Sequence, residues 1–190
     1  MINSNPAIAA HPINDLIKNR WSSLAFSEKP VEKEKVMSLL EAARWAQSSY
    51  NEQPWNYVVG YMGDETHKKL AECLAEGNSW AKTAPVLMLS IANLLFIINK
   101  STNLHAIHDT GAASVSMALQ ATDMDMVMHQ MGGYSKDIAC ENFNIGADHA
   151  PVAMIAIGYP GDAANLPESL KTRESAKRTR KPIEEIIWKQ

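Results

Sequence analysis

The sequence Gln47-Ser48-Ser49-Tyr50-Asn51-Glu52-Gln53-Pro54-Trp55 lies between a stretch with helical periodicity and an apolar stretch that predicts a strand. It is a turn of short hydrogen-bonding side chains, closed by a proline and an aromatic residue. Such side chains can satisfy their own backbone, and they can also hold the polar rim of a flat ligand. Because loops often carry binding residues, both interpretations stay open here.

On both sides of this turn, the hydrophobic pattern predicts alternating helices and strands. Before it, Val36, Leu39, Leu40 and Ala43 recur at helical spacing. The predicted helices cover 13–18, 30–47, 65–75, 105–122, 136–142 and 183–189, and the predicted strands cover 56–62, 85–92, 127–131 and 151–158. Residues 1–12 are expected to form a loose arm. Residues after Asp162 are expected to form a polar tail that ends in the last short helix.

Composition narrows the class of protein. A chain of 190 residues, 46% of them hydrophobic, suits one domain with a sizeable core. The net charge of -3 gives no attraction of the whole molecule to nucleic acid. Cys73 and Cys140 lack CxxC spacing, which argues against a disulfide framework and fits a reducing cytoplasm. Residues 1–12 do not resemble a signal peptide, and no apolar run reaches the roughly 18 residues of a membrane span.

Three further stretches carry groups suited to a ligand. Arg20-Trp21-Ser22 combines a forked cationic donor with a hydroxyl and can bind an anion, although a surface arginine beside a helix end is the simpler explanation. Gly132-Gly133-Tyr134 lets the backbone approach a ligand closely, or forms a plain turn. Residues 171–181 contain six basic side chains, which indicate a solvated face, a nucleic-acid patch or a phosphate clamp. In an extended segment, Arg178 and Arg180 would point to one side.

The helix predicted at 105–122 is rich in alanine, glycine and serine. Small side chains let another helix approach closely, either at a dimer contact or within the chain. His105 and His108 are near enough in sequence to share a metal, but no carboxylate pattern completes such a site. We therefore expect no metal site.

Taken together, these motifs resemble the FMN-dependent nitroreductase family. The resemblance rests on the order and spacing of five stretches, which span roughly 13–188: Arg20-Trp21-Ser22, Ser48 to Trp55, Gly132-Gly133-Tyr134, Ile157-Gly158-Tyr159-Pro160 and Arg178-Thr179-Arg180-Lys181-Pro182. It implies an α+β fold with three α/β/α layers and a mixed, mostly antiparallel central sheet. It also implies a single domain over 1–190 in an intertwined homodimer, with a C-terminal extension from about 162 to 190 wrapping the partner subunit.

The resemblance also implies two FMN sites at the dimer interface. The residues that it assigns to each site are Arg20, Trp21, Ser22, Ser48, Ser49, Asn51, Gln53, Asn78, Gly132, Gly133, Arg178 and Arg180. The first motif would contact the phosphate and the flavin pyrimidine edge, and the central turn would reach the flavin from the other subunit. Asn78 would touch the isoalloxazine edge, and the glycine pair would offer amides near N5 and O4. The C-terminal arginines would pair with the phosphate.

The implied activity is an NAD(P)H-dependent, FMN-containing oxidoreductase. NADH or NADPH would reduce the flavin and leave before a nitroaromatic, quinone or related acceptor binds, in a ping-pong cycle. Because FMN carries the hydride, no catalytic side chain is required. Alternatives are an FMN-dependent enal or enone reductase or dehalogenase, and a non-catalytic flavin-binding or redox-sensing dimer. Nucleic-acid binding through 171–181 is less favoured, because aromatic residues do not alternate with the basic ones.

The sequence departs from the family pattern in several places. Leu24 stands where a basic residue is usual, which removes one cationic contact, and Trp21 stands where arginine or histidine is common. Gln47 replaces a frequent proline, and 124–126 replaces a stretch that usually contains glycine. Residues 95–104 are short, so we expect no large substrate lid.

Overall fold

One four-stranded sheet forms the centre of the structure, a computed structural model that describes residues 5–188. Its strand order is β1-β2-β4-β3, and each neighbouring pair is antiparallel. The strands are β1 (Trp55–Tyr61), β2 (Val86–Asn93), β3 (Val127–Met131) and β4 (His149–Gly158). The central strand β2 is buried along almost its whole length, which explains its continuous apolar run. All four predicted strands are confirmed.

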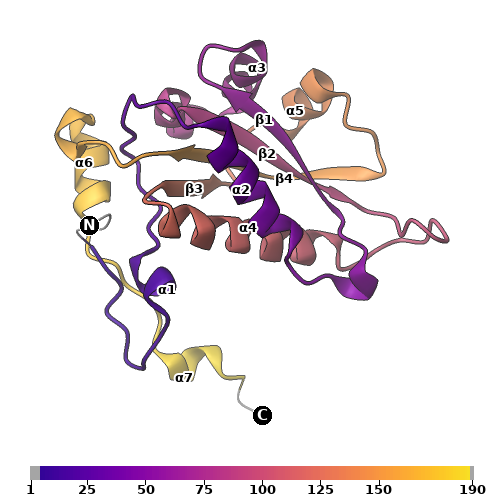
Figure 1. Cartoon of the computed structure of the whole chain (residues 1–190), viewed down its shortest axis with the longest axis horizontal. Helices are drawn as coiled ribbons and strands as arrows, with labels where there is room; N and C mark the ends of the chain where they lie inside the picture. Colours follow the sequence, from indigo (N-terminus) through magenta and orange to yellow (C-terminus); the bar gives the residue numbers. More distant parts are fainter. Residues whose placement is uncertain (1–4, 189–190) are drawn as a thin grey trace.

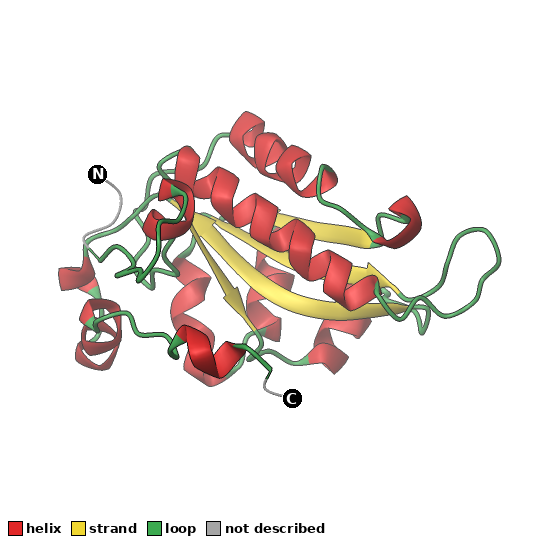
Figure 2. Cartoon of the chain, turned by 90° about the horizontal axis from the view of Figure 1, so that it is seen from below, coloured by secondary structure: helices red, strands yellow, loops and turns green. Residues whose placement is uncertain are grey.

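Helices cover both faces of this sheet (Figures 1 and 2). The α-helices are α1 (Asp15–Asn19), α2 (Lys33–Arg44), α3 (Glu65–Cys73), α4 (Ala106–Asp123), α5 (Lys136–Phe143), α6 (Glu168–Ser175) and α7 (Ile183–Ile186). Short 3-10 helices are η1 (Ser49–Asn51), η2 (Glu76–Thr83) and η3 (Ala163–Asn165). The predicted helices are confirmed within a few residues at their ends. This is the α+β, three-layer fold class that the sequence predicts.

Each face of the sheet has its own hydrophobic core. On one face, α2 and α4 pack side by side and bury Leu39 and Met117 against β2 and β4. On the other, α3, η2 and α5 bury Leu70, Trp80 and Ala139. The two cores are separated by the sheet, because alternate strand residues point to opposite faces. α4 is the long helix of the first face, and its length separates the segments that lie at its two ends.

Local sequence explains where several helices begin. Asn14, Asp64 and Ser135 each precede a helix, and each side chain accepts a hydrogen bond from a backbone N–H of the first turn. At the C-terminal end of α5, Asn144 has a left-handed backbone with φ 51°, a conformation that asparagine tolerates better than most residues.

The segment after Asp162 contains a helix that the sequence pattern did not reveal. Residues 168–175 were expected in a polar tail, but they form α6. This helix has no buried residue and so no apolar stripe to signal it. A Glu168–Lys171 pair one turn apart and a carboxylate contact made by Glu174 support it instead.

The two ends of the described chain run together, away from the sheet (Figure 1). The Asn5 side chain donates a hydrogen bond to the Ala176 carbonyl at 2.8 Å, and the Ala7 N–H donates to the Lys18 carbonyl at 2.9 Å. The proposed arm begins at residues 1–4, which lie outside the described part, as do 189–190. No helix within 5–188 is long and apolar enough to cross a membrane.

The link between β2 and α4 is a narrow loop that projects from the molecule (Figure 2). Leu95 and Thr102 form an isolated bridge, and the Phe96 N–H donates to the Ser101 carbonyl at 2.8 Å. At its tip, Ile98 is 94% exposed. This loop contacts the central turn, because the Tyr50 and Phe96 rings meet edge to face at 6.0 Å.

Candidate functional site: a cluster of three arginines

Three arginines from the two ends of the chain lie close together. Burial lowers the pKa of Arg20, and the neighbouring charge of Arg180 lowers it further. Burial also lowers the pKa of Arg178, with added repulsion from Arg20 and Arg180. Within residues 5–188, none of the three forms a salt bridge with a carboxylate. Positive charges held together without a protein counter-ion make an anion site, and a phosphate fits this donor set.

The three side chains are not equally free. Arg178 donates from one nitrogen to the carbonyls of Asn5 and Lys18, and its guanidinium lies over the Trp21 ring at 5.3 Å. Arg20 donates to the Ser22 hydroxyl at 3.1 Å. Within residues 5–188, the exposed Arg180 side chain donates only to the adjacent Thr179 carbonyl. Arg180 is therefore the most accessible of the three to a ligand.

Trp21 and Leu24, the two departures in the first motif, have structural partners. The Trp21 indole contacts Arg178 and donates to Glu174 at 3.2 Å. The Leu24 side chain is buried in a core of the sheet, and its N–H donates to Glu174 at 2.7 Å. A basic side chain at position 24 would have to leave this core. Glu174 of the C-terminal extension thus accepts hydrogen bonds from both residues within the same chain.

The predicted glycine pair and Asn78 meet at the end of β3. The Asn78 side chain donates to the Gly133 carbonyl at 2.9 Å, and the Ala75 N–H donates to the same oxygen at 3.1 Å. A Cβ at position 133 would lie 2.6 Å from the Asn78 amide nitrogen, so this contact needs glycine. At Gly132, a Cβ would meet nothing within 4 Å. The open space beside Gly132 permits the close backbone approach that a planar ring would need.

The central turn is unusually constrained. Three of its non-glycine residues, Tyr50, Asn51 and Gln53, have left-handed backbones with φ of 53°, 54° and 51°. Such conformations cost on the order of 1–3 kcal/mol each and persist where surrounding contacts enforce them. Ser48 uses its hydroxyl to accept the Gln53 N–H at 3.0 Å. For Ser48, the interpretation in which the side chain hydrogen-bonds to the backbone of its own turn is therefore correct.

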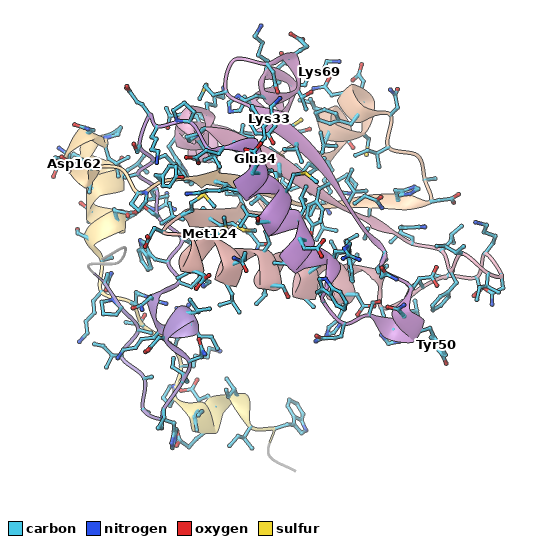
Figure 3. The ribbon with its side chains drawn as sticks, in the orientation of Figure 1. Lys33, Glu34, Tyr50, Lys69, Met124 and Asp162 are labelled. Atoms are coloured by element: carbon cyan, nitrogen blue, oxygen red, sulfur yellow. The ribbon has the colours of Figure 1, made fainter. Side chains whose placement is uncertain are left out.

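A buried carboxylate at the start of α4 anchors this turn. Asp109 is 4% exposed and accepts the Ser49 N–H at 2.9 Å, while its second oxygen contacts the His108 ring at 2.9 Å. The Ser49 hydroxyl and the side-chain amide of Asn51 make no hydrogen bond within residues 5–188. The Tyr50 side chain points away from the body (Figure 3) and is 90% exposed. The sequence did not single out Asp109, because a helix pattern does not show which acidic residue is buried.

The structure does not bring all the predicted residues together within one chain. The central turn is fixed to the N-terminal end of α4 through Asp109. Ser23, in the segment beside the arginine cluster, is fixed to β3, which follows the C-terminal end of α4. An 18-residue helix is about 27 Å long, and Figures 1 and 3 place α1 and Tyr50 at opposite sides of the molecule. One chain therefore holds the first motif, with Arg20, near one end of α4 and the central turn near the other.

His129 on β3 supports the first motif from the sheet side. Its Nδ1 lies 3.0 Å from the Ser23 carbonyl, and its ring packs 4.8 Å from that of Trp80. Burial lowers the pKa of His129 below its ordinary 6.5. The neutral ring that this favours can donate to the carbonyl through Nδ1–H.

We expect this histidine to make stability fall in mild acid. In the unfolded chain the imidazole has its ordinary pKa near 6.5, so below this pH it takes up a proton that the buried folded ring does not. The free energy of unfolding therefore begins to fall as the pH drops below about 6.5, and stops falling below the lower pKa of the folded ring. Between pH 6.5 and 5.5 the contribution is at most about 1.4 kcal/mol. Urea unfolding at pH 7.5 and 5.5 measures it. His129→Gln should lose less stability than wild type over this interval, and an equal loss in both proteins would contradict the assignment.

Comparisons with known proteins match most of the chain. The family model described as "Nitroreductase family" matches residues 17–159. The structure is similar to that of an oxidoreductase containing FMN, with a TM-score of 0.91 and 36% identity over 99% of this chain and 96% of that one. A 15.4 kDa uncharacterised protein of Mycolicibacterium smegmatis is 31% identical over 70% of this chain and 93% of its own length. A protein of Archaeoglobus fulgidus with NADH dehydrogenase and NAD(P)H nitroreductase in its name is 24% identical, over 81% and 88%.

The matched region begins before the first arginine and contains the central turn, Asn78, the glycine pair and the whole sheet. It ends before the C-terminal arginines, which are placed by the structure alone. Since the family model covers well over half of the sequence and the fold agrees throughout the described residues, the chain belongs to the nitroreductase family.

Proposed function

We propose that the protein is an NAD(P)H-dependent flavin oxidoreductase that binds FMN at a homodimer interface and reduces nitroaromatics, quinones or related acceptors by a ping-pong mechanism. The arginine cluster carries the proposal, because Arg20, Arg178 and Arg180 lie near one another with no carboxylate partner among residues 5–188. The similarity to an oxidoreductase containing FMN supports the choice of cofactor. The name of the Archaeoglobus fulgidus relative supports NADH or NADPH as the reductant. When bound, FMN would accept a hydride and pass it to the acceptor.

The protein residues would bind and orient this cofactor. Arg20 and Arg180 would hold the phosphate, with Arg178 fixed behind them by Trp21. Asn78 is held by the Gly133 carbonyl and would meet the flavin edge, and the amide of Gly132 would face the ring. Cations and amides near the pyrimidine would stabilise negative charge on it, as preorganised donors do elsewhere. No catalytic side chain is part of this proposal.

The homodimer follows from the separation of the two halves of the site. α4 presents apolar or small residues outward at four-residue intervals: Ile107, Gly111, Val115 and Leu119. Ile107 and Val115 are 54% and 52% exposed, and a Cβ on Gly111 would meet nothing within 4 Å. A two-fold axis across α4 would pair the helix with an antiparallel copy. The central turn of the partner would then approach this chain's arginine cluster, and Ser49 and Asn51 could reach the flavin.

Flavin content and acceptor turnover test the proposal. We expect purified protein to show visible flavin absorbance, either directly or after FMN is added and excess removed. It should also oxidise NADH or NADPH in the presence of a nitroaromatic or quinone. Turnover only with enals, enones or halogenated acceptors would instead favour the reductase or dehalogenase alternative. Bound flavin without oxidation of either nucleotide would favour a non-catalytic dimer, and a protein that binds no flavin would contradict the proposal.

A further inference from the structure

One carboxylate joins the first motif to the C-terminal extension. Glu174 on α6 accepts hydrogen bonds from the Ser23 hydroxyl at 2.6 Å, the Leu24 N–H at 2.7 Å and the Trp21 indole at 3.2 Å. Both carboxylate oxygens are used. Ser23 and Leu24 are each 4% exposed, so most of this contact is shielded from water. Three donors separated from Glu174 by about 150 residues therefore share one acceptor.

The partners of Glu174 are neutral: a hydroxyl, a backbone N–H and an indole N–H. Within residues 5–188 this carboxylate forms no salt bridge. Four residues later, Arg178 lies over the same Trp21 ring that donates to Glu174. Glu174 thus fixes the backbone that carries Arg178 and Arg180 against the backbone that carries Arg20. It does so without neutralising any guanidinium, which leaves all three charges for an anion.

The opposite side of the first motif is fixed by the sheet, because His129 contacts the Ser23 carbonyl. Ser23 is therefore held between β3 and α6, one residue after Ser22 and three after Arg20. A site that binds through several charge-assisted hydrogen bonds depends on having its donors in place before the ligand arrives. After loss of one of these two supports, the contacts of Arg178 with Asn5, Lys18 and Trp21 would have to hold the C-terminal arginines beside Arg20 against their mutual repulsion.

We propose that Glu174 is a positioning residue for the cofactor phosphate: it holds the first motif against the C-terminal extension so that the three arginines converge. The inference rests on the proposed function. It predicts that removing the Glu174 charge changes the FMN affinity in the direction opposite to the one that simple electrostatics predicts. A negative charge near a phosphate site repels the phosphate, so its removal alone would tighten FMN binding. If Glu174 acts by position, its removal weakens binding.

The test measures FMN and riboflavin dissociation constants for the flavin-free protein by quenching of flavin fluorescence. Glu174→Gln keeps the size of the side chain but offers an amide in place of one acceptor oxygen. We expect its FMN dissociation constant to rise about tenfold or more, with little change for riboflavin, which lacks the phosphate. General damage to the fold would weaken both ligands. The Trp21 emission spectrum should also change, because the indole loses its carboxylate partner.

Glu168→Gln provides the matched control. Glu168 lies on the same helix and undergoes the same charge change, but it is exposed and pairs only with Lys171. Its FMN dissociation constant should stay within about twofold of wild type, since an exposed pair contributes little. An unchanged or lower FMN constant in Glu174→Gln would overturn the inference while leaving the flavin function intact. A wild-type protein that binds neither flavin would instead contradict the proposed function.

A second variant keeps the test decisive if Glu174→Gln does not fold. Ser23→Ala removes the shortest of the three hydrogen bonds and should raise the FMN constant several-fold. Both changes break the Ser23–Glu174 contact, and Ser23→Ala also removes the hydrogen bonds between the Ser23 hydroxyl and the Ala25 backbone. The loss of FMN affinity in the double variant should therefore be clearly smaller than the sum of the two single losses. Fully additive effects, or a Ser23→Ala protein with wild-type affinity for FMN, would show that the contact does not position the site.

Discussion

Replacing Val115 with glutamate is expected to leave the purified protein monomeric and without bound flavin. Val115 lies midway along the outward face of α4, where its side chain is 52% exposed in the single chain. In the proposed dimer this face meets its own copy, so the variant would bury two like charges beside each other. An uncompensated buried charge costs about 3–5 kcal/mol. In the proposed dimer each site uses the central turn of the other subunit, so dissociation would also remove the flavin contacts of that turn.

Met62→Glu is the matched control for this prediction. Met62 follows β1 and is also 52% exposed, so the two substitutions introduce the same charge at equally exposed apolar positions. Glutamate is also a better helix former than valine, so the fold of the single chain should tolerate the change in α4. Light scattering after gel filtration gives the mass, and absorbance gives the flavin content. A Val115→Glu protein that remains dimeric and yellow would contradict the proposed interface.

The sheet and most helices were predictable from the sequence because their hydrophobic periods are clear. β2 is an uninterrupted apolar stretch, and α2 repeats Val36, Leu39 and Ala43 on one face. α6 could not be found in this way, because it has no fully buried residue and only Leu170 packs against the core. Periodicity reports burial, and so it does not detect a helix that has a single apolar contact and is otherwise held by polar ones.

The motifs single out the groups that we propose to bind the ligand, but not the residues that hold these groups. Arg20, Arg180 and the glycine pair stand out in sequence because guanidinium groups and glycines have few substitutes near a phosphate or a flat ring. Glu174, Asp109 and His129 do not stand out, because their importance depends on partners far away in the sequence. Glu174 and the donors it accepts from are separated by about 150 residues. The pattern of a single sequence does not show which residues pair over such a separation.

The second large effect concerns Arg180. Its only hydrogen bond within residues 5–188 is to the adjacent Thr179 carbonyl, so its donors are available to a phosphate. Arg180→Ala should weaken FMN binding by about 1.5–3 kcal/mol, the scale of a hydrogen bond to a charged group. Riboflavin binding should change little. Lys177→Ala is the matched control, because Lys177 is an exposed cation in the same segment, and its loss should produce only a small, salt-screened effect.

The stability of the flavin-free protein distinguishes Arg180 from Arg178. Repulsion from Arg180 helps to lower the pKa of both Arg20 and Arg178, so Arg180→Ala relieves unfavourable charge and should leave the melting temperature unchanged or higher. Arg178→Ala removes contacts to two carbonyls and to the Trp21 ring, so it should lower the melting temperature as well as the FMN affinity. In Arg180→Ala we therefore expect the FMN affinity to fall while the melting temperature stays the same or rises. This combination is typical of a residue that binds the ligand and does not stabilise the fold. A lower melting temperature with unchanged FMN affinity would instead make Arg180 a structural residue.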